Sequence, residues 1–400
     1  MSRNQYGRVV NARSSISPNA AATAVGRRRK LLFLVTEDWY FVSHRLDLAI
    51  AARRAGYDVM VATRVDRHGD RITDAGLGLR PLAFNRGGLN PFEEILTLIR
   101  IAAIYRREAP DIVHHVAVKP VIYGSLVARL LGIKGIVNAL SGLGYVFSST
   151  GRRAAVLRCL VEPVLRLALG GSRSRLIVQN GDDRIRLTAR GLARDESIRV
   201  IRGSGIDAGR YRPADPLSDP PLVVLPGRML WEKGVAEFVD AARRLKAAGV
   251  KARFALVGSP DEANPASIEL AQIEAWALEG AVEYWGWRDD MPNVFAQAQI
   301  VCLPSNHEGL PKVLLEAAAC GCAMVASDIP GCREIVKEGL TGWLAPVRDA
   351  DALADALQQA IRRPDLREQY GRSARALIAA DFSVDRIAKE TVAVYDELIA

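Results

Sequence analysis

The chain has 400 residues, 49% hydrophobic and 25% charged, which is typical of a soluble globular protein and is long enough for two domains. This composition argues against a disordered chain and against a membrane bundle, and no run of about 18 consecutive apolar residues could form a spanning helix. The five cysteines follow no disulfide or zinc spacing, since Cys320-Gly321-Cys322 has no second pair. No metal site is therefore predicted.

The net charge of +9 is unevenly distributed along the chain. Residues 1–200 contain 32 Lys and Arg against 16 Asp and Glu, whereas the remainder contains 22 against 29. A basic N-terminal half suggests an anionic partner, such as lipid headgroups, a phosphorylated acceptor or nucleic acid. Solvated surface charge is the alternative explanation.

Residues 1–30 are rich in Ser, Ala, Asn and Arg and lack the apolar core of a signal peptide. We predict a disordered basic tail there. The next segment, residues 31–204, alternates apolar runs at 31–35, 57–63, 136–140 and 176–180 with helical patterns at 43–55 and 120–131. Such alternation predicts a doubly wound parallel sheet. No G-x-G-x-x-G follows the first run, which argues against a dinucleotide site.

Polar side chains follow several of these predicted strands. His44 and Arg45 come after the first, His115 and Lys119 after the strand that ends near residue 115, and Gly142 and Tyr145 after the strand at 136–140. Residues 152–175 show apolar side chains at helical spacing with arginines between them. This amphipathic segment either packs on its own domain or lies in a membrane interface.

Residues 205–221 are rich in Gly and Pro and predict a hinge. Residues 222–382 alternate again, with strands expected at 222–226, 252–258 and 281–285 and helices at 234–248 and 265–279. A further helix is predicted over 383–399, packed across the two domains. The sequence therefore predicts two α/β domains.

The segment Ser305 to Ala317 follows an apolar run that predicts a buried strand, and its Ala-rich end predicts a helix. Ligands of α/β sheets bind at such junctions, where a helix N-terminus favours an anion. Gly309 allows close approach of the backbone, and Pro311 suits a first helical position. Glu308 and Glu316 lie eight residues apart and are expected to face one crevice.

Several separated motifs occur in one order: Pro226-Gly227-Arg228, Lys233-Gly234, His307-Glu308-Gly309, Glu316, Gly321, Pro330-Gly331, Glu334 and Gly342. In this order they resemble the C-terminal half of the retaining GT-B-fold glycosyltransferase family 4. The run from Trp39 to Arg45, His115 with Lys119-Pro120, and the loop Gly142 to Tyr145 resemble members that extend polyprenyl-diphosphate-linked oligosaccharides. The histidine that many members carry beyond the Asp-x-x-His turn is Val116 here.

The resemblance implies a GT-B fold: two Rossmann-like doubly wound domains that face a cleft, an acceptor-binding domain at 31–204, a nucleotide-sugar-binding domain at 222–382, and a crossover helix at 383–400. It implies that Arg228 and Lys233 neutralise a leaving diphosphate, that Glu316 binds ribose hydroxyls, and that Glu308 with Gly309 and Leu310 holds the sugar and phosphate. Catalytic roles are expected for Glu308, Arg228, Lys233 and His115. The remaining donor-site residues are Gly227, Trp287, Arg288 and Pro311, and the acceptor-site residues are His44, Arg45, Lys119, Gly142 and Tyr145.

The expected activity is transfer of a hexose or N-acetylhexosamine from a UDP-sugar to a polyprenyl-diphosphate-linked saccharide of a surface polysaccharide. No cofactor or metal is expected, because no D-x-D pair is placed to hold one. We also expect a cytoplasmic protein bound peripherally to an anionic membrane, and no nucleic-acid partner. The alternatives are a GDP-sugar-dependent transferase with another lipid or core acceptor, a nucleotide-sugar 2-epimerase, and a catalytically silent nucleotide-sugar-binding subunit.

Overall fold

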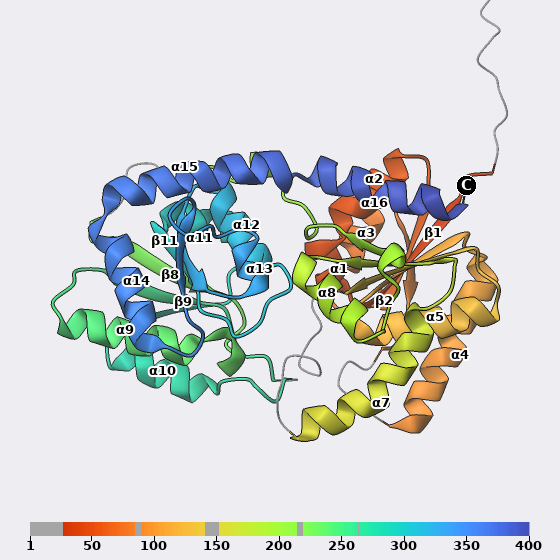
Figure 1. Cartoon of the computed structure of the whole chain (residues 1–400), viewed down its shortest axis with the longest axis horizontal. Coiled ribbons are helices and arrows are strands. Elements are labelled where there is room, and N and C mark those ends of the chain that lie inside the picture. The colour runs from red at the N-terminus through yellow and green to blue at the C-terminus, as the bar shows by residue number, and fades with distance from the viewer. Residues whose placement is uncertain (1–26, 85–89, 141–151, 214–218, 263, 400) are drawn as a thin grey trace, which may run out of the picture.

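The computed structural model describes residues 27–84, 90–140, 152–213, 219–262 and 264–399, which form two domains side by side (Figure 1). The first domain contains a seven-stranded parallel sheet of order β3-β2-β1-β4-β5-β6-β7. Its strands are β1 Lys30–Glu37, β2 Asp58–Arg64, β3 Gly78–Pro81, β4 Ile112–Val116, β5 Gly135–Leu140, β6 Ser174–Val178 and β7 Ile198–Val200. The central strands β4 and β5 are buried throughout, because helices cover both faces of the sheet.

The helices of this domain are α1 Asp38–His44, α2 Leu46–Arg54, α3 Gly69–Asp74, α4 Pro91–Glu108, α5 Val118–Leu130, α7 Arg152–Leu169 and α8 Gly181–Ala189. The helix predicted over 43–55 corresponds to α2 and the last two residues of α1, because Arg45 leaves helical geometry (φ −132°) between them. The amphipathic segment predicted from residue 152 is helix α7, which packs against α5.

The second domain contains a six-stranded parallel sheet of order β10-β9-β8-β11-β12-β13. Its strands are β8 Leu222–Pro226, β9 Arg253–Val257, β10 Glu283–Gly286, β11 Ile300–Leu303, β12 Ala323–Ser327 and β13 Gly342–Ala345. Its α-helices are α9 Val235–Ala247, α10 Leu270–Leu278, α11 Met291–Gln297, α12 Lys312–Ala319, α13 Pro330–Arg333, α14 Ala350–Arg362 and α15 Pro364–Asp381. Short 3₁₀ helices lie at η1 Asp195–Ser197 in the first domain, η2 Ala208–Arg210 in the linker and η3 Trp231–Lys233 in the second domain.

The last helix, α16 Val384–Ile399, returns to the first domain. Helices α15 and α16 run one after the other along the same side of both domains (Figure 1). Helix α15 contacts α12 and β12, whereas α16 contacts α2 and β5. Ile387, Val394 and Tyr395 of α16 are buried among the core residues of the first domain. The chain therefore crosses between the domains at the α15–α16 junction, and the fold predicted from the sequence is confirmed.

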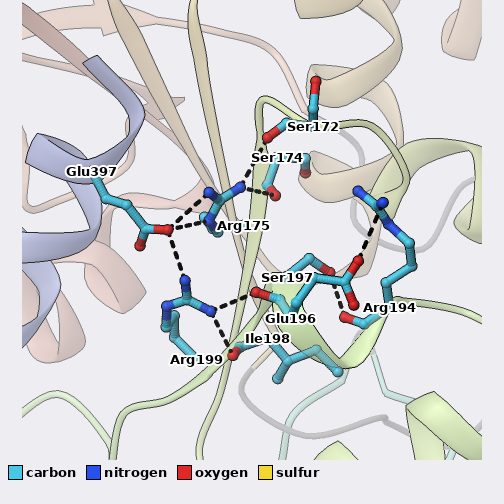
Figure 2. A network of polar contacts seen from close by, with 9 residues as sticks. All are labelled: Ser172, Ser174, Arg175, Arg194, Glu196, Ser197, Ile198, Arg199 and Glu397. Carbon is cyan, nitrogen blue, oxygen red and sulfur yellow. Dashed lines mark hydrogen bonds and ion pairs between the residues drawn. The ribbon is translucent and has the colours of Figure 1, made fainter. Parts of the chain in front are cut away.

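A cluster of charged side chains fastens the end of α16 to the first sheet (Figure 2). Glu397 accepts a hydrogen bond from Nε of Arg175 on β6 at 2.9 Å and one from Nη2 of Arg199 on β7 at 2.7 Å. Burial alone would raise the pKa of the Glu397 carboxyl. The hydrogen bonds and positive charges of Arg175 and Arg199 outweigh burial, so the pKa is lowered. Because the groups are partly exposed, each pair stabilises the fold by about 1 kcal/mol or less.

Candidate active site

The loop at residues 305–311, here called the donor loop, joins β11 to α12 at the carboxyl end of the second sheet. Helix α12 begins at Lys312, and Pro311 is its N-cap, so the expectation that Pro311 occupies the first helical position is wrong by one residue. Glu308 lies within the loop, and Glu316 lies in the second turn of α12 with 7% of its surface exposed. The loop thus presents one carboxylate, and the helix behind it presents a second.

Two side chains hold the Glu316 carboxylate, and both contact the same oxygen. Tyr211 Oη donates to Glu316 Oε1 at 2.8 Å, and Nζ of Lys312 also pairs with Oε1. Burial, together with the negative charge of Glu316, raises the pKa of Tyr211, which keeps this hydroxyl a donor. The i,i+4 spacing of Lys312 and Glu316 is a signal that sequence reasoning missed. Tyr211 lies in the linker, 105 residues away in the chain, and carried no signal.

Each of the two cations predicted to meet a diphosphate is paired with a carboxylate. Lys233 Nζ donates to Glu308 Oε1 at 2.5 Å, with 20% and 13% of the two side chains exposed. Arg228 Nη1 donates to Asp261 Oδ2 at 2.6 Å. Asp261 follows β9 and was not singled out from the sequence. The structure therefore brings Lys233 and Glu308 together, as the motifs suggest.

The position of Lys233 depends on the glycine that follows it. Gly234 has φ +72°, and a Cβ atom there would lie 2.1 Å from the carbonyl oxygen of Pro304, at the end of β11. The amide of Asn306 donates to the carbonyl of Glu232 at 2.9 Å. Only glycine allows this approach, which sets Lys233 beside the donor loop.

Three consecutive residues of the donor loop carry buried polar atoms that have no hydrogen-bond partner among the described residues. These atoms are Ser305 Oγ, Asn306 Oδ1 and His307 Nε2. Buried polar groups without partners cost stability and are rare in folded proteins. Their concentration directly before Glu308 marks the donor loop as a candidate ligand site.

The residues expected to seat the nucleotide base follow β10. Trp287 is 62% exposed, and its Nε1 donates to Asp289 Oδ1 at 2.9 Å. Arg288 donates from Nε and Nη2 to the two carboxylate oxygens of Asp290, each at 2.7 Å, and these bonds lower the pKa of Asp290 to about 2. A role in base binding stays a prediction for Trp287 and Arg288. Gly227, which precedes Arg228, has φ +147° at the end of β8.

His44 and Arg45 lie where helix α1 ends. The ring of His44 stacks on Tyr40 with centroids 4.3 Å apart. Burial first, and then the positive charges of Lys312 and Arg45, lower the pKa of His44 to about 3, so the ring is neutral at pH 7. Since Lys312 begins α12, His44 of the first domain faces the donor-loop helix of the second. Arg45 is 5% exposed, and its Nε has no hydrogen-bond partner among the described residues.

His115 is placed in the interior of the first domain. Its Nδ1 bonds Asn138 Oδ1 at 2.8 Å, its Nε2 bonds Tyr105 Oη at 2.9 Å, and none of its surface is exposed. Burial lowers the pKa of His115 to about 4. A fully buried ring with both nitrogens engaged cannot contact a substrate. The predicted catalytic role of His115 is therefore set aside.

Among the other predicted acceptor residues, Lys119 pairs with Glu94 of α4, with Nζ and Oε1 2.7 Å apart. Gly142 and Tyr145 lie outside the described residues. Across the described ranges, no group of three or more His, Cys, Asp or Glu side chains is arranged to hold a metal ion. A search of the same ranges for a helix both long enough and apolar enough to cross a membrane finds none.

The donor loop also touches the first domain directly. Asn180, which follows β6, donates from Nδ2 to the carbonyl oxygen of Gly309 at 2.9 Å. Gly203 lies so close to the loop that a Cβ atom there would be 2.5 Å from Cδ2 of Leu310. The second domain's loop is thus seated on the first domain, as expected of a site assembled from both.

Two facing Rossmann-like domains with a strand–loop–helix site between them are the architecture of the GT-B fold. The model of the glycosyl transferases group 1 family matches residues 210–377, and the glycosyl transferase 4-like model matches residues 30–180. The chain belongs to the glycosyl transferases group 1 family, with a glycosyl transferase 4-like N-terminal domain.

Known relatives extend this similarity over most of the chain. The N,N'-diacetylbacillosaminyl-diphospho-undecaprenol alpha-1,3-N-acetylgalactosaminyltransferase of Campylobacter jejuni is 28% identical over 368 residues, 89% of this chain and 95% of that protein. The alpha-maltose-1-phosphate synthase of Mycolicibacterium smegmatis is 30% identical over 328 residues, 73% of this chain and 80% of that protein. Anabaena Alr3699/HepE, solved in complex with UDP and glucose, has a similar fold, with a TM-score of 0.73, 18% identity and coverage of 92% and 99% of the two chains.

Proposed function

We propose that this chain transfers a hexose or N-acetylhexosamine from a UDP-sugar to a polyprenyl-diphosphate-linked saccharide in surface polysaccharide synthesis, at the inner face of the cell membrane. The observation that carries the proposal is the pairing of Lys233 with Glu308 at 2.5 Å on a donor loop whose neighbouring polar atoms lack partners. The C. jejuni relative, named for a diphospho-undecaprenol acceptor, supports the acceptor class.

In this proposal the protein binds both the ribose and the diphosphate of the donor. Glu316 Oε1 is engaged by Tyr211 and Lys312, which directs Oε2 to the ribose hydroxyls. Lys233 and Arg228 exchange their carboxylate partners for phosphate oxygens when the nucleotide binds. Arginine can bond two phosphate oxygens at once, and lysine acts as a point charge. The HepE structure with UDP and glucose supports a uridine nucleotide as the donor.

The chemical step breaks the bond between the anomeric carbon and the diphosphate oxygen. Negative charge grows on the diphosphate, and fixed cations stabilise that charge more in the transition state than in the bound substrate. The acceptor hydroxyl forms the new bond on the same face of the sugar, and its proton passes to the departing diphosphate oxygen, so the configuration is retained. In this proposal the protein's own cations neutralise the leaving group.

Donor binding is the first test. Thermal-shift measurements with UDP, GDP and UDP-sugars would be made on the wild type, on Glu316→Ala and on Glu279→Ala, a surface carboxylate of the same domain paired with Arg243. We expect UDP to stabilise the wild type and Glu279→Ala, and Glu316→Ala to lose the shift. Selective stabilisation by GDP would contradict the donor assignment, and no response to either nucleotide would contradict the proposed donor site itself.

Turnover then separates the remaining alternatives. Purified protein would receive the UDP-sugar with a polyprenyl-diphosphate-linked saccharide, with a sugar phosphate, or with no acceptor. Transfer to the lipid-linked acceptor alone is the expected result. Epimerised sugar without any acceptor would indicate a 2-epimerase. Transfer only to the sugar phosphate would place the chain with its alpha-maltose-1-phosphate synthase relative and overturn the acceptor proposal.

A further inference from the structure

Helix α4 carries a second apolar face that the domain core does not cover. Ile101 and Tyr105 point into the core and are buried. Four large apolar side chains of the same helix are exposed: Phe92 by 83%, Ile95 by 55%, Leu96 by 43% and Ile99 by 59%. Their spacing of three, one and three residues places them on one side of the helix. A surface helix normally turns charged residues to this side.

The first turn of α4 is held in place by its neighbours. Asn90 caps the helix, with its side-chain oxygen accepting from the amide of Phe92 at 3.1 Å. Glu94 pairs with Lys119 at the start of α5 at 2.7 Å. Figure 1 shows α4 at the outer edge of the first domain, beside α5 and on the side away from α16. The exposed apolar face therefore lies at an outer edge of the domain, where an extended surface can reach it.

Arginine side chains flank this apolar face. An open cavity of about 450 Å³ lies between α4 and the ends of β2 and β3, and Arg64 and Arg100 line it together with Phe84 and Leu96. Glu93 also lines this cavity, and Arg64 lies 3.4 Å from Glu37. Guanidinium groups suit phosphate oxygens, because their planar N–H groups bond two oxygens at once.

Arg67, which follows β2, is 86% exposed, and the last turn of α4 carries Arg106 and Arg107. Apolar side chains next to arginines are the combination that binds an interface of acyl chains and anionic headgroups.

We propose that the first half of α4, from Phe92 to Arg100, docks the protein on an anionic phospholipid bilayer. The four apolar side chains enter the interface, and Arg64 and Arg100 contact lipid phosphates. The proposal rests on the proposed function, because a polyprenyl-linked acceptor is held in the bilayer and the enzyme must reach it there. In α7, the exposed apolar side chains among those described are Val164 and Leu167.

Vesicle co-sedimentation of the full chain tests this surface. The vesicles are phosphatidylcholine with and without phosphatidylglycerol. We expect the wild type to bind the mixed vesicles more strongly, and Phe92→Ser with Ile99→Ser to bind them about 10-fold more weakly or worse, since each exposed side chain contributes apolar area to insertion. Arg64→Gln with Arg100→Gln should lose the preference for phosphatidylglycerol.

Leu130→Ser and Leu278→Ser are matched controls, because these leucines are 86% and 89% exposed but lie at the end of α5 and in the second domain. Both should bind vesicles as the wild type does. Equal binding by the Phe92/Ile99 variant, equal loss in the controls, or no binding by the wild type would each overturn the docking surface.

The UDP thermal shift, measured on the same preparations, separates this proposal from the proposed function. If the wild type is stabilised by UDP but does not bind vesicles, only the docking-surface proposal is refuted. If the wild type binds vesicles through α4 but is not stabilised by any nucleotide, the donor proposal is refuted and the docking-surface proposal remains supported.

Discussion

The side-chain amide of Asn180 joins the two domains at the donor loop. Its Nδ2 donates to the carbonyl of Gly309 at 2.9 Å and also to Oδ2 of Asp183 at 3.1 Å, while its Oδ1 accepts from the amide of Asp183 at 2.8 Å. One buried residue therefore caps α8 of the first domain and holds the loop of the second. This contact couples the relative position of the domains to the geometry around Glu308.

Replacing Asn180 by Ser should separate these two roles. Serine also caps helices, but its hydroxyl is too short to reach the Gly309 carbonyl. Loss of the bond to Gly309, about 1 kcal/mol, predicts a fall in kcat/KM of roughly 3- to 10-fold. The bond from Nδ2 to Asp183 is lost as well, so Tm should fall slightly. Gln297→Ala is the control, because it also removes an amide-to-carbonyl bond, at an exposed position at the end of α11. Equal kcat/KM in wild type and Asn180→Ser would contradict the coupling.

Lys233→Ala should lower kcat by roughly 100-fold or more, because a fixed cation opposite the departing diphosphate is lost. Arg228→Ala should have an effect of the same order. Steady-state kinetics of these variants and of Arg243→Ala, a surface cation of the same domain, would measure it. Near-normal turnover in both Lys233→Ala and Arg228→Ala would refute the donor-site assignment.

The double variant Lys233→Ala with Glu308→Gln distinguishes folding from chemistry. Lys233→Ala alone leaves the Glu308 carboxylate without its cation, at 13% side-chain exposure, and should lower Tm. The neutral glutamine should recover part of that Tm. Activity should stay low, since the cation is still missing; recovered activity would show that Lys233 acts only by neutralising Glu308.

Tyr211→Phe should weaken UDP binding by roughly 3- to 10-fold, the equivalent of about one hydrogen bond. The substitution removes the donor that orients Glu316 and leaves the ring in place. Calorimetric titration with UDP measures the change, and Tyr284→Phe on β10 is the control. Unchanged affinity would mean that Lys312 alone orients the Glu316 carboxylate.

Stability should decrease in acid because of His115. Burial lowers its pKa from 6.5 to about 4, so between these values the unfolded chain takes up a proton that the folded chain refuses. The free energy of unfolding therefore falls as the pH drops from about 6.5 towards 4. Urea unfolding at several pH values should show this slope, and His115→Gln should reduce it. Part of the slope should persist, since burial also lowers the pKa values of His114 and His44. An identical slope in the variant would contradict the assignment.

Most of the second domain could be predicted from sequence because its signals are local. The apolar run at 222–226 is strand β8 without a shift in either boundary, and the helix expected over 234–248 is α9 within one residue at each end. Apolar runs bounded by Gly and Pro indicate strands regardless of what packs beside them. The break at Arg45 was missed because the local pattern continues through it and only the backbone geometry interrupts the helix.

The site was predicted less completely, and the residues that were missed or misassigned share one cause: their partners lie far away in the sequence. Asp261, Tyr211 and Asn180 act through contacts with residues 33, 105 and 129 positions away. His115 was misassigned for the same reason, since Tyr105 and Asn138 enclose its ring from a helix and a neighbouring strand. Periodicity and motif spacing carry no information on such partners.

By itself the sequence determined the two α/β domains and the order of the donor motifs, since apolar periodicity and glycine placement are encoded within short segments. Only the tertiary structure decided which polar groups face one another: that Tyr211 and Lys312 share one oxygen of Glu316, that Asn180 holds the donor loop, and that α4 turns Phe92 outward. These relationships depend on how distant elements pack, and packing is a property of the whole fold.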